Sequence, residues 1–65
     1  MAENYTPRVK RMLLDASCAF VRQGKGDHEI WYSPLTQRHF MVDAKIKSKL
    51  WANHTLKQAG LPKAF

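Results

Sequence analysis

Three short β-prone runs lie between two helical patterns, and this order restricts the fold more than any other feature of the chain. The runs cover residues 19–23, 28–33 and 38–42, where aromatic and β-branched side chains are frequent. Gly24-Lys25-Gly26 supplies the positive-φ positions of a hairpin connection, and Pro34 stands near the start of a second turn. The sequence therefore predicts three antiparallel strands arranged as a meander.

The flanking segments carry the residue spacing of amphipathic helices. Thr6 is able to cap the first helix, and Pro7 suits its first position. Apolar residues then recur at i, i+3, i+4 and i+7, which predicts a helix over residues 7–17: Val9, Met12, Leu13 and Ala16. Ser48 offers an N-cap for a second, narrower apolar stripe, which predicts a helix over residues 48–59.

These elements define a single α+β domain over residues 1–65, with the order α-β-β-β-α. Both helices are expected on one face of the three-stranded antiparallel sheet, with the other face in solvent. Trp31 and Trp51 are expected either at the edge of the core or as exposed contacts. The predicted core draws on every element: Val9, Met12, Leu13, Ala16, Phe20 or Val21, Ile30, Phe40, Val42 and Leu56.

Size and charge restrict the classes of function. A chain of 65 residues buries little core, so a groove for a large polymer is favoured over a deep cofactor pocket, and no cofactor is expected. The formal charge is +6, and no acidic residue follows Asp43. This basic surface either serves solubility or attracts phosphates. Neither a signal peptide nor a membrane span is recognisable, so a cytoplasmic protein without membrane contact is expected.

Cysteine and histidine usage argues against a disulfide or a metal site. Cys18 is the sole cysteine and is expected to be a small buried or half-buried residue. The three histidines are scattered over different predicted elements and lack the spacing of ligand pairs, so no metal ligand is expected. His39 and His54 are interpreted as ordinary surface residues.

The chain carries a family resemblance over nearly its whole length, and two segments are its most specific parts. The first is Phe20-Val21-Arg22-Gln23-Gly24-Lys25-Gly26-Asp27-His28, in which a glycine-x-histidine follows an arginine-glutamine strand. The second is Leu56-Lys57-Gln58-Ala59-Gly60-Leu61. Together with the helices and strands, they make the chain similar to the HicA, or YcfA-like, toxins of HicAB toxin-antitoxin systems.

The resemblance implies a double-stranded-RNA-binding-like fold and a type II toxin that cleaves messenger RNA as a metal-independent ribonuclease. It also implies a HicB-type antitoxin as the protein partner. The catalytic histidine of the family corresponds to His28, which follows Gly26 at the expected spacing. Imidazole moves protons near neutral pH, as cleavage of RNA without a metal requires.

Further roles are assigned around His28. Gly26 lets an RNA backbone approach closely, and Lys25 is suited to stabilising the charge of the transition state. Asp27 and Glu29 either orient the imidazole or are simply solvated. The expected RNA-binding residues are mostly basic: Arg22, Lys25, Gly26, Arg38, Lys45, Lys47 and Lys49.

Trp31 and Tyr32 are suited to stacking on unpaired bases. At least one of them is expected to pack in the core or against a partner, because neighbouring strand residues face opposite sides of a sheet.

Two other classes of function stay open. One is a non-catalytic module with the same fold that binds RNA or an antitoxin. The other is a small structural or regulatory protein with an acidic protein partner. Binding of RNA without cleavage would favour the first, and failure to bind RNA even at low salt would favour the second.

Overall fold

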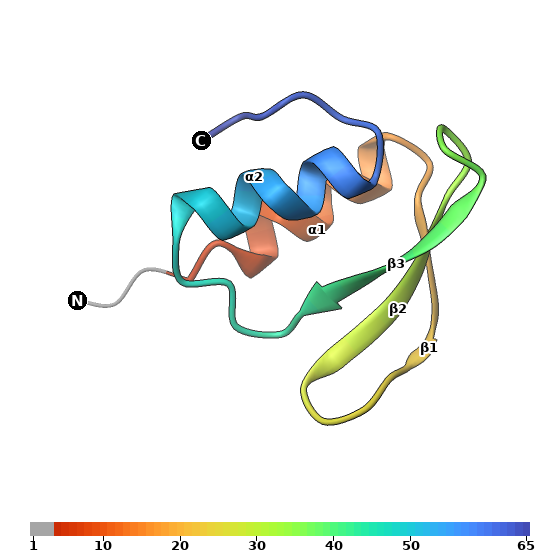
Figure 1. The fold of residues 1–65 in the computed structure, drawn as a ribbon, viewed down its shortest axis with the longest axis horizontal. Helices are drawn as coiled ribbons and strands as arrows, with labels where there is room; N and C mark the ends of the chain where they lie inside the picture. The colour runs from red at the N-terminus through yellow and green to blue at the C-terminus, as the bar shows by residue number, and fades with distance from the viewer. Residues whose placement is uncertain (1–3) are drawn as a thin grey trace.

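The computed structural model describes residues 4–65 and confirms the predicted order of elements (Figure 1). The chain begins with helix α1, continues through three strands and closes with helix α2. The bounds are α1 Thr6–Asp15, β1 Ala19–Gln23, β2 His28–Ser33, β3 Arg38–Asp43 and α2 Lys49–Gln58. The architecture is therefore α-β-β-β-α.

The three strands form an antiparallel sheet in the order β1-β2-β3. Along β2 and β3 the register is regular: His28 pairs with Asp43 at one end, and Ser33 pairs with Arg38 at the other. Between β1 and β2 the register shifts between Phe20 and Arg22, as at a β-bulge. The meander predicted from the turn sequences is confirmed.

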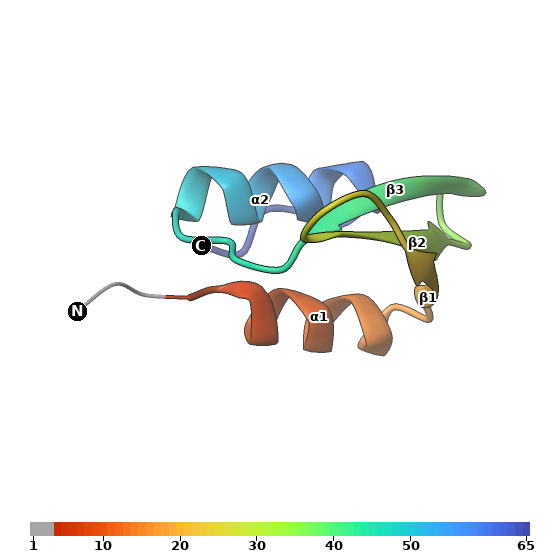
Figure 2. The ribbon, with the colours of Figure 1, turned by 90° about the horizontal axis from the view of Figure 1, so that it is seen from below.

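Both helices lie on the same face of this sheet (Figures 1 and 2). Helix α1 lies nearer β1, and α2 lies nearer β3, in the view of Figure 2. On the covered face, the paired residues Trp31 and Phe40 are buried, with Val42 beside them. The alternation of strand side chains thus assigns the odd-numbered residues of β2 to the face that the helices cover.

This register contradicts the prediction that Ile30 belongs to the core. Ile30 pairs with Met41 on the opposite face, where Ile30 is half-buried and Met41 is 54% exposed. The physical reason is the period of a strand, in which Ile30 and Trp31 necessarily face opposite sides. Trp31, at 4% exposed, occupies the core position instead.

The prediction of Phe20 or Val21 as a core residue is also wrong. Both lie on the edge strand β1 and are about half exposed, at 51% and 46%. Val21 falls in the register shift and has no cross-strand partner, while the Phe20 ring touches only the edge of Trp31, with centroids 6.2 Å apart. The edge position and the bulge together keep these side chains out of the core.

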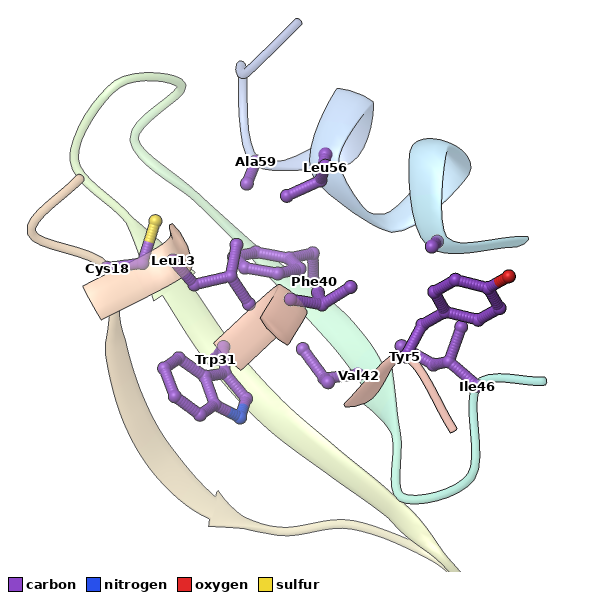
Figure 3. Close-up of a cluster of buried hydrophobic side chains, with 11 residues drawn as sticks. Tyr5, Leu13, Cys18, Trp31, Phe40, Val42, Ile46, Leu56 and Ala59 are labelled. Carbon is purple, nitrogen blue, oxygen red and sulfur yellow. The ribbon is translucent and has the colours of Figure 1, made fainter. Parts of the chain in front are cut away.

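The core fills the space between the helices and the sheet (Figure 3). Val9, Leu13, Phe40, Val42 and Leu56 are buried as predicted, and Met12 and Ala16 pack against them partly buried. Cys18 is buried, as expected of a small apolar residue. Ala52 and Ala59, which belong to the predicted apolar stripe of the second helix, are also buried. The sequence interpretation missed two buried residues that lie outside the predicted elements, Tyr5 and Ile46.

The two helix starts differ from each other. Ser48 caps α2 as predicted, because its Oγ accepts a 3.1 Å hydrogen bond from the backbone N–H of Trp51. Thr6 does not cap α1; it is already helical, and Tyr5 occupies the N-cap position. The Thr6 hydroxyl instead donates to the carbonyl of Asp43 at 3.3 Å and accepts from the N–H of Ile46 at 2.8 Å.

Candidate functional site

His28 is held at the start of β2 by the loop that connects β1 to β2. Its carbonyl oxygen accepts hydrogen bonds from the N–H of Gly24 at 2.8 Å and from Nε2 of Gln23 at 3.0 Å. The same Gln23 amide also donates to the carbonyl of Gly26 at 3.1 Å. Because these contacts join both ends of the loop, the backbone of His28 has a fixed position.

Glycine is required at two positions of this loop for different reasons. Gly26 has φ +64°, a conformation that side chains disfavour, and open space surrounds it. Gly24 has no positive φ, but a Cβ there would meet the carbonyl oxygen of His28 at 3.0 Å. Thus Gly26 sets the turn, and Gly24 permits the close approach of the two strands.

His28 lines a groove of about 340 Å³ at the β3 edge of the sheet, with β3 on one side and α2 on the other. On the sheet side, the wall is formed by the first residue of β2 and by residues of β3: His28, Phe40, Met41 and Asp43. The pairing of His28 with Asp43 brings these two side chains to the same end of the sheet. The Asp43 carboxylate also accepts a 2.9 Å hydrogen bond from the N–H of Lys45, which fixes the start of the following loop.

The other wall of the groove is one face of α2. It consists of residues at positions i, i+3, i+4 and i+7 of the helix: Trp51, His54, Thr55 and Gln58. Side chains at this spacing lie on one side of an α-helix. This helical face is the signal that the sequence interpretation missed, since it assigned His54 to the surface without relating it to His28 or Trp51.

An aromatic pair stands on this wall. The Trp51 indole stacks on the His54 imidazole with ring centroids 5.1 Å apart and an angle of 26° between the planes. Gln58, one turn further along α2, places its Nε2 2.7 Å from Nε2 of His54. Trp51 nevertheless remains 49% exposed. The groove that His28 lines therefore presents an accessible aromatic surface on its α2 side.

Glu29 faces away from His28 and takes no part in orienting it. Its carboxylate accepts hydrogen bonds from Nε1 of Trp31 at 2.9 Å and from Nζ of Lys10 at 3.0 Å. The hydrogen bond from the Trp31 indole lowers the pKa of Glu29 from its ordinary value of 4.5; burial opposes this effect, and the hydrogen bond and charge of Lys10 lower the pKa further. This contact joins α1 to the sheet. Asp27 is exposed in the loop.

The predicted RNA-binding residues divide by position. Lys25 and Gly26 lie in the loop directly before His28. Arg22 lies on β1, where it pairs with Ile30 of β2. Lys45, Lys47 and Lys49 follow the end of β3 that pairs with His28, and all three are exposed. Ile46 is fully buried between the first two of these lysines, so both face outward.

Arg38 is the exception among these basic residues. It pairs with Ser33 at the end of β3 opposite His28. Asp43 lies five residues after Arg38 along the strand, a distance of about 17 Å at a rise of 3.3–3.4 Å per residue.

The aromatic residues of β2 are separated as strand alternation requires. Trp31 is buried in the core, which confirms that at least one of the pair serves packing. Its burial also removes it as a platform for unpaired bases. Tyr32 lies half-buried on the uncovered face, where its ring meets the edge of exposed His39 at a centroid distance of 5.2 Å.

Neither a metal centre nor a membrane span is recognisable in residues 4–65. Nowhere in this range do three histidine, cysteine, aspartate or glutamate side chains gather around a position for one metal ion. Within the same range, the helices are too short and too polar to cross a bilayer.

Comparison with protein-family models, with curated proteins and with solved structures finds no match for this chain. Its function is therefore inferred from its own residues and from their arrangement around the groove.

Proposed function

We propose that this protein is a metal-independent ribonuclease of the HicA toxin kind, which cleaves messenger RNA in the cytoplasm and is neutralised by a HicB-type antitoxin. The observation that carries the proposal is the place of His28 in a groove, with exposed Lys25 in the loop before it and further exposed lysines in the loop after its strand partner Asp43. Loop hydrogen bonds hold the backbone of His28, and its side chain is half-buried against the groove. A catalytic imidazole needs this combination of a fixed position and access to a polymer.

The reaction requires two proton movements. The ribose 2′-oxygen attacks the adjacent phosphorus as its proton leaves, and the bond from phosphorus to the 5′-oxygen breaks as that oxygen gains a proton. A 2′,3′-cyclic phosphate and a free 5′-hydroxyl result, so the atoms balance with no net consumption of water and without a metal. His28 performs one of these transfers and solvent water performs the other, while Lys25 in the adjacent loop stabilises the charge that builds on the phosphate.

Cleavage of RNA by the purified chain tests the proposal directly. His28→Ala should reduce the rate by about 10²–10⁴-fold, the usual contribution of a positioned acid or base, and should abolish growth inhibition. The parent activity should persist in the presence of a chelator. His39→Ala is the matched control, because His39 is exposed on the uncovered face outside the groove. A folded His28→Ala protein with parental activity would refute the role of His28.

A second function is favoured by the carboxylates around His28. Asp43 lines the groove beside it and Asp27 is exposed in the preceding loop, so negative charge lies where a phosphate would approach. These groups favour a non-catalytic module that keeps the fold and binds RNA or an antitoxin. A folded chain that binds RNA and leaves it intact would establish this function in place of the first.

A further inference from the structure

The groove beside His28 contains an aromatic surface that catalysis by a single histidine does not use. Trp51 is 49% exposed although it stands in the first turn of α2, where the neighbouring Ala52 is fully buried. The exposed indole shares the groove with Met41, which is 54% exposed, and contiguous exposed apolar surface of this kind marks ligand or partner sites. Its position in the same groove as His28 indicates that the ligand of His28 also covers Trp51.

We propose that Trp51 and His54 form a stacking site for an unpaired nucleobase, so that the substrate of His28 is single-stranded rather than double-helical RNA. The inference rests on the proposed function, because it takes RNA as the ligand. His54 supports the indole from within the helix at a centroid distance of 5.1 Å, and the exposed part of the indole receives the base. Base stacking on an aromatic side chain requires an unpaired base, which a duplex does not offer.

The surroundings of Trp51 suit a nucleotide more than an apolar ligand. Phe40 and Met41 provide an apolar part of the groove, while His28 and Gln58 bring polar groups that can form hydrogen bonds with base edges. Exposed lysines precede Trp51 at the start of α2 and in the loop before it, at positions 45, 47 and 49. Positive charge beside an aromatic surface is the combination that proteins use for single-stranded nucleic acids.

The geometry also assigns different roles to the two tryptophans. Trp31 is 4% exposed and its Nε1 is engaged by Glu29, so it reports on the core. Trp51 is exposed and reports on the groove. A single-stranded ligand should therefore quench the emission of Trp51 and leave that of Trp31 unchanged.

The test measures binding separately from cleavage. The probe is a 2′-O-methyl oligoribonucleotide of about ten nucleotides, a length within the usual site sizes, which lacks the 2′-hydroxyl nucleophile. Trp51→Ala should weaken its binding by about 5–100-fold, and Trp51→Phe should restore most of the affinity. Leu50→Ala is the matched control, because Leu50 is an 80% exposed apolar residue of the same helix outside this groove. The same strand annealed to its complement should bind more weakly than the single strand.

The outcomes separate the inference from the proposed function. If the parent protein cleaves RNA and Trp51→Ala binds the probe as tightly as the parent, the stacking site is refuted while the ribonuclease stands. Equal affinity for single strand and duplex would refute it in the same way. If the parent binds no RNA at low salt, the proposed function fails and the inference fails with it. Circular dichroism of each variant shows whether α2 is retained.

Discussion

The Oγ of Ser33 donates a 2.6 Å hydrogen bond to the backbone carbonyl oxygen of Ala59. Ser33 is the last residue of β2, and Ala59 is the C-cap of α2. Both residues are fully buried, and the Ala59 carbonyl belongs to the helix end that has no intrahelical donors. This bond therefore attaches the end of α2 to the sheet on which the groove is built.

Replacing Ser33 with alanine should destabilise the fold. The change leaves the Ala59 carbonyl without its side-chain donor in a buried position, and it also removes the acceptor for the N–H of Leu35. The expected loss in free energy of unfolding is about 1–3 kcal/mol. Urea denaturation should show a lower midpoint with an unchanged slope. A midpoint equal to that of the parent would show that the bond contributes nothing.

The stability of the fold should decrease as the pH is lowered, and part of this decrease should come from Glu29. The pKa of Glu29 is lowered by the hydrogen bond from Trp31, and Lys10 adds to this effect. The folded state therefore prefers the carboxylate, so its contribution is complete well above pH 4.5 and is lost as the pH falls through that value and below it.

Glu29→Gln should accordingly be less stable than the parent at neutral pH by about 1 kcal/mol, because the Lys10 ion pair is lost and the indole then donates to a neutral acceptor. Near pH 3.5, below the ordinary value, the difference should shrink, since the unfolded parent chain then binds a proton that the folded carboxylate resists. Urea midpoints at both pH values measure this. A difference that stays constant with pH would mean that the titration of Glu29 is not linked to folding.

A substitution at the end of α1 should stabilise the protein. Ser17 has φ +69° and occupies the left-handed position after the helix, where the N–H of Cys18 bonds to the carbonyl of Leu13 at 2.9 Å. Glycine adopts this conformation without steric cost. Ser17→Gly should therefore raise the free energy of unfolding by about 0.5–1 kcal/mol, after its larger unfolded-state entropy is included.

The matched control is Ala16→Gly, one residue earlier. Ala16 has φ −91°, so glycine there relieves no strain; it brings the entropic cost, removes a methyl group that packs against the core, and should lower stability. Thermal unfolding of the two variants measures the contrast. If both variants shift the midpoint in the same direction, backbone conformation at position 17 is not the cause.

The sequence predicted the elements well because each one carries its own local signal. Ser48, the glycines of the first hairpin and the stripe that contains Val9 and Leu13 all act within a few residues. Local signals do not determine which side of the sheet a given strand residue faces. Ile30 and Trp31 are both apolar, and the period of two does not say which of them faces the helices. Only the packing of α1 and α2, with Trp31 opposite Phe40, decides this.

The candidate site shows the same division. The family resemblance points to His28, and it rests on a short segment, residues 20–28, in which a glycine loop precedes the histidine. Trp51 and His54 were not connected with it, because their place beside His28 depends on how α2 packs along β3. The apolar stripe of α2 predicts which face of the helix is buried. It does not predict that the neighbouring side, with Trp51 and His54, lies next to β3.

Affinity for single-stranded RNA should depend steeply on salt, and the lysines of the loop between β3 and α2 should carry part of that dependence. Lys45 and Lys47 are exposed at the end of the sheet where His28 lies, because buried Ile46 directs both outward. Each phosphate contact contributes about 0.7 to the slope of log affinity against log salt for a single strand. Replacing both lysines with glutamine should reduce the magnitude of the slope by about 1.4.

A matched pair of substitutions tests whether position matters in addition to net charge. Arg8 and Arg11 are exposed on α1, and neither lines the groove. Changing both to glutamine removes the same charge as changing both lysines. The slope of log affinity against log salt should nevertheless change by much less, because contacts to phosphates act over about a Debye length of 8–10 Å. Fluorescence anisotropy of the labelled 2′-O-methyl strand across a salt series measures both. Equal changes for the two pairs would indicate that the charge of the whole protein attracts RNA and that the groove has no special part in it.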